Sequence, residues 1–342
     1  MAYDPQQLYI DPILTGFSLG YEEQTLYGTR LAPEMTVRSK SARYRVFDRS
    51  HWLLYSDRRE PGTQTRTIQP RKWSEDTYKT QQHALKGFVA DEERRELTSQ
   101  GGLADATFGG DLQIDPDRDV TEDTTGAILR GHENLVQSRF RNTANYAAGH
   151  TTALAGAAKW SDYTYVTPGD VTSIVSNPVA DIKTAVMRVY LDTGRWPNTM
   201  VIPIDALGVI EGHPRVVDRF KNFALTDAEA WKQLLNVPAP ANFFIVDSKY
   251  NAAQNVFAAE SISSFWGQDV WIGLVDPTPG QRTKTFAKTF VYPQPNGEVR
   301  AVDSWRENDP RGDWHRTTYE YDVKVVSNVA GYLIQTAVAA VS

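Results

Sequence analysis

The sequence predicts an α+β fold, in which helices and strands are mixed without the strict alternation of a doubly wound sheet. Two segments, 119–149 and 177–194, carry apolar residues at helical spacing between start and stop signals. Apolar and polar residues alternate as in strands at 319–325 and in several shorter runs. Because the helices and strands do not follow one another in regular pairs, the pattern favours α+β over α/β.

The bulk composition excludes several classes of protein. The 342 residues suffice for two compact units, or for one unit with long appendages. A net charge of -6 argues against a general nucleic-acid binder, which usually has a strongly basic face. The absence of cysteine excludes disulfides, thiolate metal sites and thiol catalysis. No apolar run approaches the roughly 20 residues of a membrane helix, so we expect a soluble protein used without secretion.

The first 37 residues show no sustained period of either 2 or 3.6. They mix three prolines with scattered tyrosine, leucine and phenylalanine. This pattern predicts an extended arm that lies on another surface.

A strongly basic segment follows at 38–72. It holds ten lysines or arginines against three acids, a local charge of +7. Strand-like alternation on both sides of Pro61-Gly62 predicts a long hairpin. The hairpin is either a solvated surface, a subunit contact, or a base-stacking platform that would use Trp52, Tyr55 and Trp73.

The next segment, 91–123, is acidic, with eleven acids against three arginines, and contains the flexible joint "GGLADATFGG". A helix of about 30 residues, roughly 45 Å long, is predicted at 119–149. Asp119 and Glu122 form a capping box at its start. The irregular apolar stripe predicts a helix that lies along a sheet, with Leu135, Val136 and Phe140 in the core.

A second unit begins with a helix that has Asn177 as N-cap, Pro178 at its first position and Gly194 at its end. Helical patterns recur at 205–221 and 226–236. Strands are predicted at four further places, namely 199–203, 242–247, 269–275 and 284–292. The last stretch, 317–338, predicts two core strands separated by Ser327-Asn328, with Val323, Val325 and Ile334 in the core.

No motif of a nucleotide-binding enzyme, metalloprotease or serine hydrolase is present, and the six histidines never pair at metal-ligand spacing. The sequence therefore predicts no cofactor, no metal and no catalytic residue. One polar cluster leaves an alternative open, because a hydrolase or hard-cation site could use its side chains. Its members are Asp303, Glu307, Asp309, Asp313 and His315. The turn residues at 310–313 favour the other interpretation, a polar loop between strands.

Three stretches carry a resemblance to a known family: "TGRWPNTMVIPIDALGVIEGHPRVVDR", "FFIVDSKYNAAQ" and "VRAVDSWRENDPRGDWHRTTYEYDVKVVSNVAGYLIQTAV". In their order and spacing the elements resemble the major capsid protein of tailed bacteriophages, the Hong Kong 97-type phage capsid fold. The resemblance covers nearly the whole chain. It implies an N-terminal arm, an extended β-hairpin loop, a peripheral domain with a long spine helix, an axial domain, and C-terminal strands that return to the peripheral domain. These parts correspond to 1–37, 38–86, 87–176 with the spine helix at 119–149, 177–303 and 304–342.

The resemblance implies a structural protein without enzymatic turnover. Copies of the chain would assemble as pentamers and hexamers into an icosahedral shell around packaged double-stranded DNA, without sequence-specific binding and without a membrane. The shell would be part of the virion and would form in the host cytoplasm, with separate scaffolding, portal and decoration proteins as further partners. Because the arm starts almost at Met1, any scaffold is expected to be a separate protein or absent.

We expect the basic hairpin to be the assembly interface that reaches the acidic segment 91–123 of a neighbouring subunit. Its interface residues are Arg58, Arg59, Arg66, Arg71, Lys72 and Trp73. Two alternatives remain open at this point: an encapsulin-type compartment with the same fold, and a soluble α+β hydrolase that uses the cluster from Asp303 to His315. Lys72 and Lys79 lie where some members of the family form covalent cross-links, but no motif fixes a partner, so none is predicted.

Overall fold

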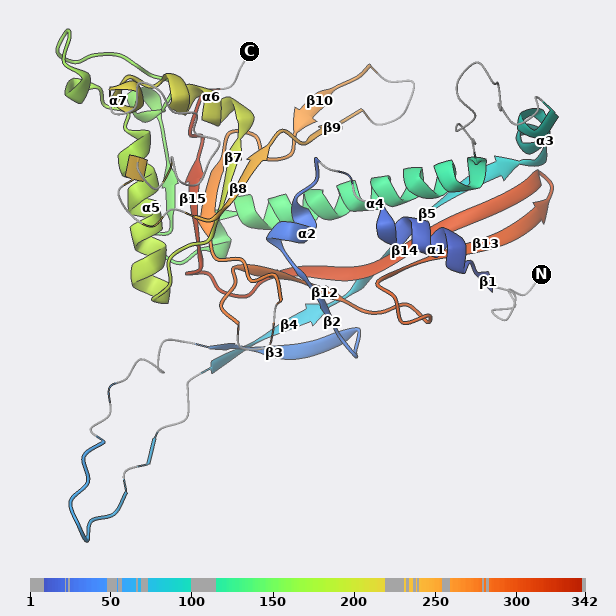
Figure 1. Ribbon diagram of the computed structural model, residues 1–342, viewed down its shortest axis with the longest axis horizontal. Coiled ribbons are helices and arrows are strands. Elements are labelled where there is room, and N and C mark those ends of the chain that lie inside the picture. The colour runs from blue at the N-terminus through green and yellow to red at the C-terminus, as the bar shows by residue number, and fades with distance from the viewer. Residues whose placement is uncertain are drawn as a thin grey trace.

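The computed structural model describes residues 9–21, 23, 25–47, 54, 57–65, 67–68, 73–99, 115–218, 231, 234–235, 238, 240–253, 259–278, 280 and 283–339. Figure 1 shows an elongated body, in which the long helix α4 (Pro116–Arg141) lies along a sheet. At one end of this helix a compact group of helices packs around a second sheet. A two-stranded hairpin, β3 (Ser41–Phe47) and β4 (Trp73–Lys79), projects from the body.

The sheet under α4 has six strands and is built around the 15-residue strand β14. The strand order is β1-β13-β14-β12-β2, and β5 pairs with the other side of β14. The bounds are β1 Tyr9–Ile10, β2 Glu34–Thr36, β5 Gln81–Ala90, β12 Ala287–Val291, β13 Arg300–Asn308 and β14 Arg311–Val325. Tyr319, Tyr321 and Val323 are buried, as their strand-like alternation predicts.

Helix α4 confirms the predicted long helix, but both of its ends differ from the predicted 119–149. It begins earlier because the Asp115 side chain accepts a hydrogen bond from the Asp117 N–H (3.2 Å) and Pro116 occupies the first helical position. The predicted capping-box residue Glu122 lies inside the helix instead. The helix ends at Arg141 because the Asn142 side chain accepts from a backbone N–H two residues on, which starts a new 3₁₀ turn.

The second sheet has five strands in the order β6-β15-β11-β7-β8. Their bounds are β6 Thr151–Ala153, β7 Thr199–Pro203, β8 Asn242–Val246, β11 Val270–Gly273 and β15 Gly331–Gln335. Helix α5 (Pro178–Thr193) confirms its prediction at both ends: Asn177 accepts from the Ala180 N–H (3.2 Å), and Gly194 has a φ of 68°. The predicted helix at 205–221 divides into α6 (Ile204–Gly212) and α7 (Pro214–Val217). Most of the predicted helix at 226–236 lies outside the described residues.

The division of the strands between the two sheets differs from the one that the resemblance implied. Strand β12 and the first residues of β13, which fall within the predicted axial segment 177–303, belong to the six-stranded sheet under α4. The last strand, β15, lies inside the five-stranded sheet and pairs with β11 and β6. Of the predicted C-terminal part 304–342, the end of β13 and β14 lie in the sheet of the long helix, whereas β15 does not.

The N-terminal segment lies on its own body rather than as a free arm. Strand β1 pairs with the edge of β13, helix α1 (Pro12–Gly20) packs on α4 and β13, and β2 pairs in parallel with β12. The short helix α2 (Gly28–Leu31) places Leu31 in the core with no exposed surface. The predicted extended arm is therefore wrong for most of residues 9–37, which contain two helices and lie on the body of their own chain.

One hydrophobic core runs through both sheets and α4. Phe140 lies at the junction, with its ring centroid 4.8 Å from that of Trp271 and 4.9 Å from that of Phe286. Of the predicted core residues, four are buried, namely Val136, Phe140, Val323 and Ile334. Leu135 and Val325 are half-buried and pack against the same core.

The remaining elements are short: α3 Asp91–Ser99, β9 Lys249–Asn251, β10 Ile262–Ser264, and 3₁₀ turns at Thr143–Asn145, Gly156–Ala158 and Val171–Ser173. Among the described helices, none is both long and apolar enough to cross a membrane.

Candidate assembly surface

The basic hairpin is exposed along much of its described strands, although Tyr44 and Tyr78 on one side pack against Phe290. Strands β3 and β4 pair with each other from Ser41–Lys79 to Phe47–Trp73 and with no other described strand. Trp73 is 43% exposed, and the Arg45 guanidinium lies 4.5 Å from its ring centroid. Such a cation–π pair contributes about 0.5 to 1 kcal/mol at an exposed site. The hairpin thus presents aromatic and cationic groups of the kind that anchor protein interfaces.

The described part of the hairpin end, 57–65, is a tight turn. Arg58 and Arg59 are exposed, and the Arg59 Nε donates to the Thr63 carbonyl (2.7 Å). Gly62 has a φ of 84°, a conformation that favours glycine. This confirms a turn at the predicted Pro61-Gly62. Arg66, Arg71 and Lys72, which were also predicted for the interface, lie outside the described residues.

A small separate cluster fixes the base of the hairpin. Val37, Tyr78 and Phe290 are buried together, and the Tyr78 and Phe290 rings stack with centroids 4.5 Å apart. Buried Glu320 on β14 accepts from Lys40 and Thr80, each at 2.9 Å. The predicted extended loop, 38–86, ends earlier than expected, because residues 81–86 already pair with β14 as part of β5.

The polar cluster that could have formed a hydrolase site is divided by strand alternation. Asp303 faces one side of the sheet, where it forms an ion pair with Arg316 (2.7 Å). Glu307 accepts from the Trp314 indole N–H on that same side. The other members do not join them. Asp309 lies in the turn between β13 and β14, and Asp313 and His315 face the opposite side.

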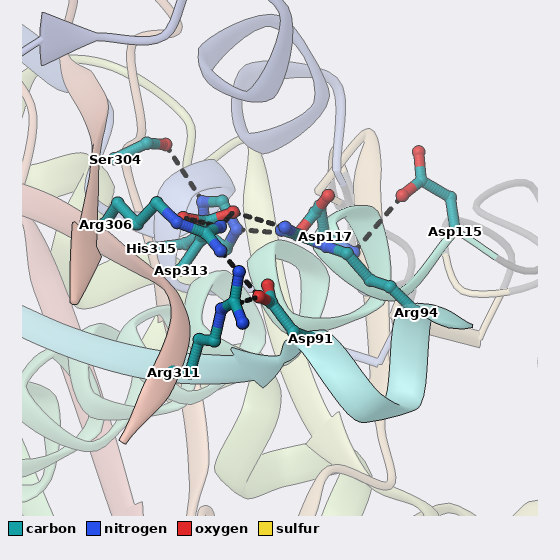
Figure 2. Close-up of polar contacts among 9 residues, drawn as sticks. All are labelled: Asp91, Arg94, Asp115, Asp117, Ser304, Arg306, Arg311, Asp313 and His315. Carbon is teal, nitrogen blue, oxygen red and sulfur yellow. Dashed lines mark hydrogen bonds and ion pairs between the residues drawn. The ribbon is translucent and has the colours of Figure 1, made fainter. Parts of the chain in front are cut away.

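On that opposite side the charges alternate along a continuous chain, shown in Figure 2. Asp91 on α3 pairs with Arg306 (2.5 Å) and Arg311 (3.0 Å), and Arg306 also reaches Asp313. Arg94 on α3 then bridges Asp313 to Asp117 on α4. These contacts fasten α3 and the first turn of α4 to the end of the β13–β14 hairpin.

The chain of contacts ends in a serine–histidine–aspartate arrangement. The Ser304 hydroxyl lies 2.9 Å from Nδ1 of His315, and Nε2 of that ring lies 2.8 Å from the Asp117 carboxylate. Burial alone would raise the pKa of Asp117, yet the hydrogen bonds from His315 and Arg94 outweigh it, so the pKa lies below its ordinary value. Because Asp117 is already neutralised by Arg94, the arrangement is better suited to fastening elements than to activating a nucleophile. No group of three candidate metal ligands occurs within the described residues.

Glu133 on α4 is a second fastening point, and no sequence pattern had singled it out. Its side chain is fully buried and accepts from the backbone N–H groups of Tyr27 (3.0 Å) and Gly28 and from the Trp266 indole N–H (2.9 Å). Burial raises the pKa of the Glu133 carboxyl, although these three donors oppose the shift. The sequence did contain a signal for this site: Glu133 falls on the same helical face as Leu129, and an acid on a buried face needs hydrogen-bond partners.

The comparisons with known proteins agree with this architecture. No family model matches the chain. It is 22% identical over 328 residues to a protein named major capsid protein of Burkholderia phage BcepMu, and the match covers 95% of each chain. A crystal structure of a phage-related protein from Bordetella bronchiseptica RB50 superposes with a TM-score of 0.70 at 23% identity, covering 97% of this chain and 99% of the other. The capsid structure of cyanophage P-SCSP1u gives a TM-score of 0.52 at 11% identity, with coverages of 89% and 86%.

The chain has the Hong Kong 97-type capsid fold. Within this capsid fold, the described residues of the basic hairpin and those of the acidic segment 91–123 do not meet in one chain. Figure 1 places the described hairpin residues and helix α3 at opposite ends of the molecule. Within this segment Asp91, Asp117 and Glu122 are already paired inside their own subunit.

Proposed function

We propose that this chain is the major capsid protein of a tailed bacteriophage, and that its copies assemble into an icosahedral shell around packaged double-stranded DNA. The observation that carries the proposal is the relative named major capsid protein, which matches 95% of both chains, together with the capsid fold. Its role is structural, without turnover. Its place is the capsid of the virion, after assembly in the host cytoplasm.

The parts of the chain have distinct roles in this proposal. The exposed hairpin at 41–79 is the assembly device, helix α4 is the spine of a peripheral domain, and the five-stranded sheet with α5 to α7 forms the axial domain near the centres of pentamers and hexamers. The charge of +7 on the basic segment and the acids of 91–123 favour contacts between neighbouring copies. Each exposed pair contributes only about 0 to 1 kcal/mol, but icosahedral repetition multiplies it. Scaffolding, portal and decoration proteins are further partners of the shell.

The decisive experiment is negative-stain electron microscopy of the purified protein, followed by analysis of the particle contents. We expect closed shells of uniform size, and particles from infected or induced cells that hold nuclease-resistant double-stranded DNA. Shells that hold a protein cargo and no DNA would support an encapsulin-type compartment instead. A small oligomer that never forms shells would contradict both assignments.

The role of the hairpin has its own test. Replacing Arg58, Arg59 and Arg66 together with glutamate should leave the melting temperature of the subunit nearly unchanged, while shells fail to form. Moderate salt should weaken assembly of the unmodified protein in the same direction, because exposed charges are screened. Normal shells that package DNA poorly would instead mean that the hairpin faces nucleic acid.

A further inference from the structure

His150 is a fully buried histidine at the place where helix α5 packs on strand β15 of the five-stranded sheet. Figure 1 shows these two elements side by side. The backbone of His150 is fixed by two hydrogen bonds, because its N–H donates to the Ala147 carbonyl (3.0 Å) and its own carbonyl accepts from the Leu333 N–H (3.0 Å). The ring therefore has a defined position, directly before β6.

Both ring nitrogens of His150 face oxygen atoms that can only accept a hydrogen bond. Nδ1 lies 2.9 Å from the Gly331 carbonyl oxygen at the start of β15, and Nε2 lies 2.6 Å from the Asp192 carboxylate in the last turn of α5. A neutral imidazole carries one N–H, so it can donate to one of these oxygens while the lone pair of its other nitrogen points at the second. The two contacts are satisfied together only when both nitrogens carry a proton.

The charges around the ring favour this protonated form. The Asp192 oxygen that contacts His150 also lies 3.0 Å from the Arg188 guanidinium, which favours an ionised carboxylate and leaves the ring as the group that holds the proton. Asp192 also stands at the negative end of the α5 dipole, where a carboxylate is stabilised by cationic partners. From β15 the ring of Tyr332 faces His150, with the centroids 6.2 Å apart.

His213, a second histidine without exposed surface, has the opposite arrangement. Its Nδ1 accepts from the Arg215 N–H (3.2 Å). The Ser176 hydroxyl donates to the Asp162 carbonyl (2.5 Å), so the Ser176 oxygen accepts from Nε2 of His213 (2.9 Å). One donor and one acceptor satisfy a neutral ring, and burial lowers the pKa of His213 to about 4. His213 is therefore neutral near pH 7.

We propose that His150 is a buried proton-binding site, in which the positively charged ring clamps helix α5 to the five-stranded sheet. The ring donates to Asp192 on the helix and to Gly331 on the sheet, and loss of its proton removes one of these two hydrogen bonds. A buried acceptor that loses its donor destabilises the fold. Alkaline solution should therefore loosen the attachment of α5, whether or not copies of the chain assemble.

Proton binding at this site makes the stability of the fold depend on pH. An exposed histidine, as in the unfolded chain, loses its proton near pH 6.5. Above this pH, folding therefore takes up one proton. The stabilisation by the clamp is complete below about pH 6.5 and falls as the pH rises. While the folded ring stays protonated, each pH unit above about 6.5 should reduce its contribution to the folding equilibrium constant by a factor of about ten.

The first test measures the protonation state on the unmodified protein. In solid-state NMR of protein with ¹⁵N-labelled histidine, the two nitrogens of a doubly protonated ring have similar chemical shifts, whereas those of a neutral ring differ widely. The signals are assigned by their loss in His150→Gln and in His213→Gln. At pH 7.5, where an exposed histidine is neutral, we expect the doubly protonated pattern for His150 and the neutral pattern for His213.

Urea unfolding between pH 7 and pH 8.5 gives a second readout. His150→Gln keeps a side-chain donor but cannot bind a proton. We expect the ratio of the folding equilibrium constants, unmodified protein over His150→Gln, to fall at least roughly tenfold across this range. His213→Gln is the matched control, because it also removes a buried ring, and its ratio should stay constant within about twofold. If His150→Gln does not fold, Asp192→Asn takes its place, since it removes the charge that favours the proton but keeps an acceptor oxygen.

Two results would overturn the proton site. One is the neutral NMR pattern for His150 at pH 7.5, and the other is a stability ratio that stays constant from pH 7 to pH 8.5. A ratio that falls as steeply for His213→Gln would overturn it as well, because the effect would then not depend on a ring that faces two acceptors.

Discussion

Phe140→Ala should be among the most destabilising single substitutions in this chain. Phe140 has no exposed surface, and its ring packs against those of Trp266, Trp271 and Phe286 where α4 meets both sheets. Truncation leaves a cavity among three large rings that cannot easily collapse, which costs about 3 to 5 kcal/mol. Each 1.4 kcal/mol is a factor of about ten, so the unfolding equilibrium should shift by roughly two to three and a half decades.

The measurement is equilibrium unfolding in urea, followed at a subunit concentration too low for assembly. With an m value of about 3 kcal/mol/M, the midpoint should fall by about 1 to 1.7 M. Tyr165→Ala is the control, because Tyr165 is 39% exposed and its truncation should change the midpoint by less than about 0.2 M. If the urea midpoint of Phe140→Ala falls no further than that of Tyr165→Ala, the Phe140 ring is not part of a core shared by both sheets. The packing of α4 on both sheets would then be wrong.

Three further predictions concern the two fastening points. Glu133→Gln keeps the shape of the side chain but leaves one of its three N–H donors facing an NH₂ group, and should cost about 1 to 3 kcal/mol in urea unfolding. Gly28→Ala should expose the N-terminal segment to limited proteolysis, because an added Cβ would lie 2.8 Å from the Glu133 carboxylate; equal protection would show that α2 can shift. Asp117→Asn should lower the free energy of unfolding by about 1 to 2 kcal/mol at pH 7. Because the pKa of Asp117 is lowered in the folded state, this difference should be present above about pH 4 and vanish as the pH falls through the folded-state pKa; a constant difference would contradict the pairing with Arg94.

The sequence predicted best those elements whose ends are set by local chemistry. Helix α5 begins and ends where Asn177, Pro178 and Gly194 indicate, and β7 spans the predicted 199–203. The start of α4 was misplaced because the capping box at Asp119 was chosen over the earlier signal at Asp115, where Pro116 occupies the first helical position and the helix begins. Strand β15 could not be assigned to a sheet, since a short apolar run has the same pattern in either one.

The candidate sites were predicted less well, for a geometrical reason. Closeness in sequence suggested a cluster from Asp303 to His315, but side chains in strands alternate, so Asp303 and His315 point to opposite faces. The true partners of His315 are Ser304, directly opposite on β13, and Asp117, almost 200 residues earlier in the chain. No spacing rule links residues that far apart before the fold is known.

The distribution of burial separates folding from assembly in this protein. The main core runs without interruption from the long helix through both sheets, so the body should unfold as one unit when that core is damaged. The hairpin, by contrast, rests on the small cluster of Val37, Tyr78 and Phe290, and its described end makes no contribution to the main core. A substitution at the hairpin end therefore disrupts little packing within the subunit and should hardly change its free energy of unfolding. It can change the free energy of association where another molecule covers the hairpin. Substitutions in the main core should therefore change the stability of the free subunit, whereas substitutions at the hairpin end should change assembly. Glu320 at the hairpin base should affect both, because it accepts hydrogen bonds from Lys40 and Thr80 and holds the hairpin on the body.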